Sequence, residues 1–587
     1  MRSIMKTDLG LILALLALLV IVVLGPFKLS EAVMNVTHRS ILWISALLSV
    51  LFASVTPHAT FAATRYVAQA AGTFSGGTAC NGQTAITYSS WNSLTLSPGD
   101  LTYVCGTITI SGSGAVGFNF RSNSGSSVSP LILRFDTGAA IVCNPYCGGG
   151  GGGSNGGAIA LGTGNSYITI DGNNLQGTVA NGYDGSPNAA CYLGTCNVQH
   201  STTLISGWSC TNCIIQNLNM IDAYVNTTGD SSIGDSSTVT AFEGSGSGLT
   251  ISGNYVHDCG WCFFVQQGNA QDNFTFANNQ VFNYAHGLAF ANQTGAAVDQ
   301  EFVYSNNIHD SANWGATGCF AHIDSLHIFG SSTSSVDHFY FYNNYIHGNW
   351  GTCPTGAIFV EGGGSSTPSH LKNSYWFNNI IDASQGPTNL TQGWMGIFAG
   401  DSGVQLVYNN TIMGPNGTDN TLCYAFSGES GSTNMSALTF ENNVAAPCGN
   451  PVAIGVSGYG VTLTASNYNF YGQYGSNAFT WQSKTAGSFS AWKTACSCDA
   501  SAVQNNTALL NTNGAPQSGS PVIGKATNLT SLATGDLAAL QYSTTEGGEI
   551  TNPPERPSSG NWDIGAYLSS VALGSPTGLS GSVTTAP

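Results

Sequence analysis

The sequence predicts an all-β fold, a parallel β-helix in which short coils stack along one axis. Three observations support this prediction: a recurring five-residue phrase, short alternating apolar segments beside it, and 75 glycines in 587 residues. A short repeated unit cannot bury its apolar face alone and does so by stacking on its neighbours. Helical periodicity is nearly absent, and glycine suits tight corners where φ is positive.

The recurring phrase begins with Asn and carries an apolar residue at its third position. Its copies lie 25 to 38 residues apart, centred on Val256, Val281, Ile308, Ile346, Ile381 and Ile412. Asn at the same corner of successive coils predicts a hydrogen-bonded ladder along the stack, with coils about 4.8 Å apart. The unequal steps indicate insertions, which are expected in loops outside the coils.

Short strands are expected on both sides of each phrase. Aromatic and polar residues alternate before it, as in 274–276 and 339–341, which is typical of a half-buried strand. A second apolar set follows at a turn's distance, as in 263–265, 288–290 and 357–359. Each coil therefore carries at least two strands joined by Gly- and Asn-rich bends.

The Asn-Asn-x-Ile-His/Asp phrases resemble the repeats of right-handed parallel β-helices in the pectin-lyase-like superfamily. The segments 65–68 and 561–567 are similar to the first strand and the last coil of that group, so the resemblance covers roughly residues 64–569. It implies a single elongated right-handed solenoid with an N-terminal cap and long loops. The superfamily includes lyases, glycosidases, epimerases and phage or surface proteins, so the resemblance is specific for fold and weak for chemistry.

Two apolar runs precede the repeats. The first, residues 9–24, belongs to a segment (1–33) that we interpret as an over-extended gene start, with an N-terminal membrane anchor as the alternative. Residues 34–63 have the layout of a secretory signal peptide, with a basic start at Arg39, an apolar centre and small residues near Ala63. A secreted or cell-surface location is therefore expected.

The rest of the chain divides by its repeat pattern. We expect an N-terminal cap and first coils at 64–160, the β-helix core at 161–475, C-terminal coils and a cap at 476–569, and a flexible tail at 570–587. We expect a monomer.

All 16 cysteines follow Ala63, and many lie in close pairs, which in an exported chain predicts a disulfide framework. The close pairs are Cys143/Cys147, Cys191/Cys196, Cys210/Cys213, Cys259/Cys262 and Cys496/Cys498. Two wider pairs, Cys319 with Cys353 and Cys423 with Cys448, are candidate links between coils. A zinc site formed by the four thiols of the two C-x-x-C units is the alternative for those units.

The formal net charge of −17 excludes a basic groove for nucleic acid as a main function. Low charge does not indicate disorder here, because 42% apolar and 10% aromatic residues suffice to fill a narrow solenoid core.

Candidate catalytic residues gather in the central coils. His322 and Asp324 are two residues apart, so they share one face of an extended segment, and a bend at Ser325 would bring His327 beside them. Glu361 and Asp401 follow comparable strands and are expected one coil apart on the same wall. A glycosidase needs two carboxyl groups about 5 to 10 Å apart, which one or two coil spacings supply.

Other residues have a functional and a structural interpretation. Trp261, Trp314 and Trp350 follow the phrase at similar distances, so they are candidates for a sugar-stacking row, or they cap coil edges. His347 is a candidate substrate contact. It shares its station in the phrase with His257, His309 and Asp382, where a polar side chain can simply bond the turn backbone.

Three functions remain open, all with a polysaccharide as partner. A polysaccharide-cleaving glycoside hydrolase is expected first, because carboxylates and imidazoles line one wall. A lyase is the alternative, although the resemblance implies an Arg or Lys base. No Arg lies between Arg134 and Arg556, and Lys372 is the one Lys between Arg134 and Lys484. His or Tyr would then be the base, and Ca²⁺ held by carboxylates the cation. A non-catalytic surface or adhesin-type glycan-binding solenoid is the third. The sequence assigns no metal ligands.

Overall fold

A computed structural model describes residues 62–569 of the chain with short gaps. The gaps are 113, 149–155, 163, 182–186, 192–193, 198–201, 225–238, 267–272, 293–296, 313–321, 331–334, 352, 362–369, 391, 399–402, 419, 429–433, 456–458, 477 and 545–552. The segments interpreted as an over-extended start, as most of the signal peptide and as the tail lie outside the described residues. The boundaries assigned to the caps and the core stay predictions.

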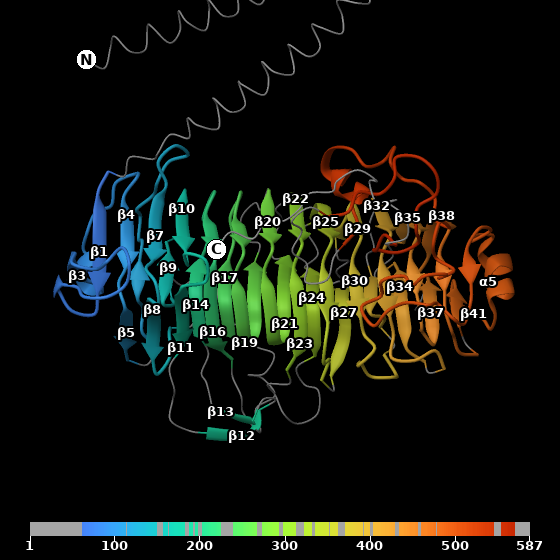
Figure 1. Ribbon diagram of the computed structural model, residues 1–587, viewed down its shortest axis with the longest axis horizontal. Helices are drawn as coiled ribbons and strands as arrows, with labels where there is room; N and C mark the ends of the chain where they lie inside the picture. The colour runs from blue at the N-terminus through green and yellow to red at the C-terminus, as the bar shows by residue number, and fades with distance from the viewer. Residues whose placement is uncertain are drawn as a thin grey trace, which may run out of the picture. The chain divides into compact units, whose positions relative to one another are not determined.

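The described strands form the coils of a parallel β-helix, which confirms the predicted fold. Figure 1 shows them side by side in chain order, from the blue strands near the start to the orange strands near the end. Nearly all neighbours pair in parallel, as β21 with β24 and β24 with β27. Strands that are neighbours in a sheet are therefore one whole coil apart along the chain.

The first sheet holds the strands that precede each Asn phrase. In order it contains β2 (Gly72–Thr73), β3 (Thr84–Thr87), β1 (Thr64–Ala68), β4 (Leu101–Val104), β7 (Leu131–Phe135), β10 (Ile168–Asp171), β15 (Ile214–Gln216), β18 (Thr250–Ser252), β20 (Phe274–Ala277), β22 (Ala297–Tyr304), β25 (Ser335–Tyr342), β29 (Ser374–Phe377), β32 (Val404–Tyr408), β35 (Met435–Glu441) and β38 (Val461–Asn467), with β28 (His370–Leu371) beside β25.

The second sheet holds the Asn phrases themselves. It contains β5 (Thr107–Ser111), β8 (Ala140–Asn144), β11 (Gly177–Asn181), β16 (Leu218–Ala223), the first halves of β19 (Tyr255–Gln266) and β21 (Gln280–Asn292), then β23 (Asn307–Ser311), β26 (Tyr345–His347), β30 (Ile380–Asp382), β33 (Thr411–Met413), β36 (Val444–Ala445), β39 (Phe470–Tyr471) and β42 (Val503–Gln504).

The third sheet continues from the second through the bent strands β19 and β21. It contains β14 (Thr202–Gly207), β17 (Val239–Gly244), the second halves of β19 and β21, β24 (Ile323–Gly330), β27 (Pro354–Glu361), β31 (Met395–Phe398), β34 (Leu422–Ser427), β37 (Asn450–Ile454), β40 (Phe479–Trp481) and β41 (Lys484–Ala486). The pairs β6 (Phe118–Asn119) with β9 (Ile159–Leu161) and β12 (Pro187–Cys191) with β13 (Gly194–Asn197) are separate. Among the described residues the helices are α3 (Tyr88–Trp91), α5 (Phe489–Cys496) and the 3₁₀ helix η2 (Gly535–Gln541).

The predicted Asn ladder is present inside the corner between the first two sheets. Each Nδ2 donates to the Oδ1 of the next ladder residue at 2.9 to 3.3 Å. The ladder residues are Asn254, Asn279, Asn306, Asn344, Asn379, Asn410, Asn443 and Asn469. The central apolar residue of each phrase points into the core and is fully buried.

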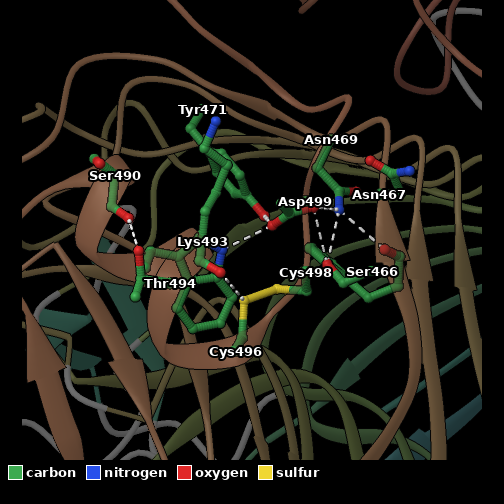
Figure 2. Close-up of a disulfide and its surroundings, with 12 residues drawn as sticks. Ser466, Asn467, Asn469, Tyr471, Ser490, Lys493, Thr494, Cys496, Cys498 and Asp499 are labelled. Carbon is green, nitrogen blue, oxygen red and sulfur yellow. Dashed lines mark hydrogen bonds between the residues drawn. A yellow bond between two sulfur atoms is a disulfide. The ribbon is translucent and has the colours of Figure 1, made fainter.

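Asp499 terminates the ladder. Its Oδ1 accepts from Nδ2 of Asn469 at 2.9 Å, and its Oδ2 accepts from the Tyr471 hydroxyl at 2.6 Å (Figure 2). The neighbouring disulfide Cys496–Cys498 joins the end of α5 to the turn that carries Asp499. A buried carboxylate thus satisfies the last donor of the stack.

The C-terminal segment returns to cover the first sheet, where the red segment in Figure 1 lies beside β29, β32 and β35. Nδ2 of Asn378 donates to the carbonyl oxygens of Ala539 and Tyr542 at 3.1 and 2.8 Å. The buried guanidinium of Arg556 donates to the carbonyls of Gly565 and Ala566 at 2.9 and 3.0 Å.

Disulfides confirm the predicted framework where the structure describes both cysteines. The bonded pairs are Cys80–Cys105, Cys143–Cys147, Cys210–Cys213, Cys259–Cys262, Cys423–Cys448 and Cys496–Cys498. Because each C-x-x-C unit closes on itself, the zinc interpretation of those four thiols is wrong. Cys319 and the pair Cys191/Cys196 fall in or beside the gaps, and Cys353 is disulfide-bonded.

In the part of the chain that the structure covers, none of the helices combines the length and apolar character needed to cross a membrane.

Candidate functional site

The site lies on the outer surface of the third sheet, where β21, β24 and β27 stack. In this register His286 pairs with Asp324, and Phe329 of β24 pairs with Glu361 of β27. Leu326 and Ile328 point into the core, so His327 between them points outward. Alternation therefore accounts for His327. Asp324 has the same parity as the inward Leu326 and nevertheless lies beside His327, because the alternation breaks at Ser325, whose hydroxyl bonds the buried Tyr284.

Asp324 is the centre of the cluster. Its Oδ2 lies 3.4 Å from Nε2 of His322, 3.7 Å from Nε2 of His286 and 3.8 Å from Nδ1 of His327. Its Oδ1 accepts from the backbone N–H of Gly356 at 3.1 Å. Asp324, His286 and His327 are buried, whereas the side chain of His322 is 33% exposed.

Glu361 lies at the open edge of the cluster. Its Oε1 is 3.1 Å from Nε2 of His327, and its side chain is 41% exposed. His327 therefore bridges a buried carboxylate on its own strand and a solvent-facing carboxylate one coil further. The structure brings together four of the five predicted catalytic residues, and the fifth, Asp401, lies outside the described residues.

Burial lowers the pKa values of two imidazoles of the cluster, those of His286 and His322. It lowers the pKa of His286 well below the usual value, with added repulsion from His327 and His322. Burial, with repulsion from His327, lowers the pKa of His322 to about 4, while Glu361 opposes the shift. Both rings are therefore neutral at pH 7.

Apolar side chains surround the inner side of the cluster. The ring of Trp261 stacks on His286 with centroids 4.2 Å apart, and it packs with Phe264 and Phe329. Phe359 of the next coil lies 5.5 Å from His327. These contacts restrict solvent to the side on which His322 and Glu361 are exposed.

The prediction that tryptophans form an exposed sugar-stacking row is wrong for Trp261 and Trp350, which are buried. Trp261 is 5% exposed because it packs against His286, and Trp350 is 1% exposed because it packs against Trp394 in the core. Trp350 also donates from Nε1 to the carbonyl oxygen of Asp382 at 3.1 Å. Trp314 lies outside the described residues.

His347 lies on the second sheet and is not part of the cluster. The residues at its station stack on one another, His257 on Phe282 at 4.6 Å, Phe282 on His309 at 5.0 Å and His309 on His347 at 5.1 Å. Nε2 of His347 bonds Oδ1 of Asn307 at 2.9 Å. The histidines of the station thus belong to a stacked row of rings with side-chain partners, whereas Asp382 at the same station accepts the backbone N–H of Ser384 at 3.0 Å, as the structural interpretation expects.

His286 is a cluster residue that sequence reasoning missed. A signal for it exists in the coil register. His286 stands two residues before the inward Leu288, and Asp324 stands two residues before the inward Leu326. Aligning the coils on their second apolar set, rather than on the Asn phrase, places His286 beside Asp324.

The donor set favours a transition metal over calcium. Ligand atoms of His286, His322, Asp324 and His327 lie within 4.8 Å of one another. Three are imidazole nitrogens, which suit zinc and similar ions, whereas Ca²⁺ takes six to eight oxygen ligands. The Ca²⁺ considered from the sequence does not fit these residues.

No family model and no curated protein matches the chain. Solved structures with a similar fold include pectate lyase Pel9A, at 13% identity and a TM-score of 0.30 over 87% of this chain and 97% of that one. XylC in complex with xylose follows at 11% identity and a TM-score of 0.42, covering 86% and 98%. The GH136 lacto-N-biosidase of Eubacterium ramulus has 9% identity and a TM-score of 0.36, covering 77% and 72%. These identities and TM-scores assign no activity to the chain.

Proposed function

We propose that this chain is a secreted enzyme that cleaves a polysaccharide by hydrolysis, with Glu361 as its proton-transferring residue. The observation that carries the proposal is the contact between Glu361 and His327 at the solvent-facing edge of a buried cluster. A half-exposed carboxylate reaches substrate, and a fixed imidazole behind it controls its orientation.

Asp324 acts in this proposal as a positioning residue. It is buried and accepts the N–H of Gly356, so it holds His327 from the inner side and does not touch a sugar. This assignment differs from the sequence expectation, in which Asp324 was one member of the acid/base pair. Asp401, which follows β31 as Glu361 ends β27, remains the proposed second carboxylate.

Glycoside hydrolysis requires that second group. One carboxylic acid protonates the leaving oxygen, while the other carboxylate activates water or attacks the anomeric carbon. Neighbouring coils are about 4.8 Å apart, so side chains on adjacent or next-adjacent coils reach the separation of about 5 to 9.5 Å that such pairs use.

Phenylalanines offer the sugar contact that the tryptophans do not. Phe329, Phe359 and Phe398 come from three successive coils of the third sheet, and Phe359 lies 6.0 Å from Phe398. Phe329 and Phe398 are partly exposed. A polysaccharide lying along the stack would pass these rings and Glu361.

The test is incubation of the full chain with neutral and uronic polysaccharides, with and without added divalent cations. New reducing ends and the ultraviolet absorbance of unsaturated products are read from the same samples. Reducing ends without absorbance support the proposal. Both signals together indicate a lyase and overturn hydrolysis, and the absence of both with retained polysaccharide binding indicates a non-catalytic solenoid.

A further inference from the structure

We propose that His286, His322, Asp324 and His327 form a binding site for one Zn²⁺ ion. The inference concerns the inner end of the cluster and stands independently of the proposed function, because the ion can bind whether or not Glu361 transfers a proton.

The spacing of the donor atoms matches a zinc coordination sphere. Nε2 of His286 lies 3.4 Å from Nε2 of His322, and these two atoms lie 3.7 and 3.4 Å from Oδ2 of Asp324. Zinc–ligand bonds of about 2.0 to 2.2 Å in a tetrahedron place neighbouring ligand atoms about 3.3 to 3.6 Å apart. The three atoms therefore form one face of such a tetrahedron.

His327 supplies the fourth corner. Its Nδ1 lies 3.8 Å from Oδ2 of Asp324, and this buried nitrogen makes no hydrogen bond with any residue that the structure describes. Nε2 of the same ring donates to the carboxylate of Glu361, so the neutral tautomer leaves a lone pair on Nδ1. A lone pair facing a carboxylate oxygen is repulsive unless a cation lies between them.

The outer partners of the ligands also match a metal site. Metal-binding imidazoles usually donate their second nitrogen to a carboxylate, and ligating carboxylates are themselves hydrogen-bonded. His327 donates to Glu361, and Asp324 accepts the backbone N–H of Gly356. Trp261 covers the face of His286, which fixes that ring, while the partly exposed His322 provides the entry path.

Four protein ligands make this a closed site, which is typical of structural zinc. The ligands come from β21, from β24 and from His322, immediately before β24. The ion would tie two successive coils together and fix the orientation of His327. A protonated His327 between two carboxylates, without metal, is the alternative that the test must separate.

The test measures zinc directly on the full chain. The purified protein is stripped with a chelator, dialysed and titrated with Zn²⁺ against a chromophoric competitor, and bound metal is counted by elemental analysis. One tightly bound Zn²⁺ per chain is expected. Replacement by Co²⁺ should give the visible absorption bands of a tetrahedral nitrogen–oxygen site. No stoichiometric binding by the folded protein would overturn the proposal.

Variants locate the site. His286→Ala and His322→Ala should each weaken zinc binding by about 100-fold or more, and His322→Ala keeps the test valid if loss of the buried His286 prevents folding. His338→Asn is the control, because His338 is a histidine on β25 of the first sheet whose side chain is 40% exposed, and the variant should bind zinc like the unmodified chain. Equal affinity in all three variants would contradict the assignment.

Glu361→Gln separates this inference from the proposed function. The variant should retain the zinc with at most about a tenfold loss of affinity, because Glu361 contacts a ligand and is not one. Retained zinc with no polysaccharide cleavage in the unmodified chain would leave the metal site established and the proposed function wrong.

Discussion

Nε2 of the buried His327 lies 3.1 Å from Oε1 of Glu361, one coil further along the solenoid. The contact joins β24 and β27. It is fixed by the register of these two strands, in which His327 pairs with Phe359 and Phe329 pairs with Glu361. A rigid stack thus places an imidazole and a carboxylate together without any contribution from a flexible loop.

Glu361→Gln tests the catalytic part of this contact. If Glu361 transfers the proton, kcat on the substrate found in the panel should fall about 10²- to 10⁴-fold. The melting temperature should change by no more than a few degrees, because the side chain is 41% exposed. Glu555→Gln, on an exposed glutamate of the C-terminal segment, is the control and should leave both quantities unchanged. Equal kcat in the two variants would remove Glu361 from the mechanism.

For Asn344, a residue of the Asn ladder, we expect a loss of stability. Its Nδ2 donates to Asn379 and to the carbonyl of Val303, and its Oδ1 accepts from the backbone and side chain of Asn306. Asn344→Ala leaves several buried polar groups unpaired, at a cost of about 1 to 3 kcal/mol each. We expect a loss of about 3 to 5 kcal/mol in the free energy of unfolding, measured by urea denaturation.

The control for this substitution is Asn505→Ala. Asn505 is exposed and accepts one local bond, from the backbone N–H of Thr507 at 2.9 Å. Its replacement should cost about 1 kcal/mol or less. A loss in Asn344→Ala as small as in the control would show that the ladder does not stabilise the stack.

The contrast between the ladder and the cluster shows which parts of the molecule local sequence can predict. Six of the eight ladder residues, from Asn254 to Asn410, belong to the repeated phrase, so their positions follow from the chain alone, and the structure extends the ladder to Asn443 and Asn469. His286 and Asp324 are 38 residues apart and meet only through the coil register, which a loop of variable length obscures. The burial of Trp350 depends on Trp394 from the next coil, so its own segment carried no signal.

Asp222 provides a pH-dependent prediction away from the cluster. Burial, reinforced by the nearby charge of Asp258 and opposed by His257, raises its pKa from 3.8 to about 6. A raised carboxyl pKa favours the protonated form in the folded state. Its contribution to stability is therefore complete below about pH 4 and is lost as the pH rises through 6.

Asp222→Asn should remove this loss. The residue has φ of +64°, a conformation that Asn tolerates, so the variant can keep the turn. We expect the variant to be more stable than the unmodified chain by about 1 to 2 kcal/mol at pH 8, with little difference at pH 4. Urea denaturation at both pH values checks this, and a gain that is the same at both would assign the effect to packing.

Arg556 is expected to control the attachment of the C-terminal segment. Its guanidinium is buried, and burial lowers its pKa to about 10 despite the opposing charge of Asp563. The carbonyls of Gly565 and Ala566 accept its hydrogen bonds, and the guanidinium lies over the ring of Trp562. Loss of this side chain removes its hydrogen bond to the carbonyl of Gly565, while the carbonyl of Ala566 keeps the backbone N–H of Thr544 at 3.0 Å.

Arg556→Ala should therefore release the segment that carries η2 without unfolding the coils. The coils have their own core and ladder, whereas this segment is held by contacts such as those of Asn378 with Ala539 and Tyr542. We expect limited proteolysis to cut the variant within the segment at least about tenfold faster, because cleavage follows the population of the open form. The melting temperature of the coils, followed by circular dichroism, should be nearly the same as in the unmodified chain. A single cooperative loss of both signals would instead show that the segment and the coils form one folding unit.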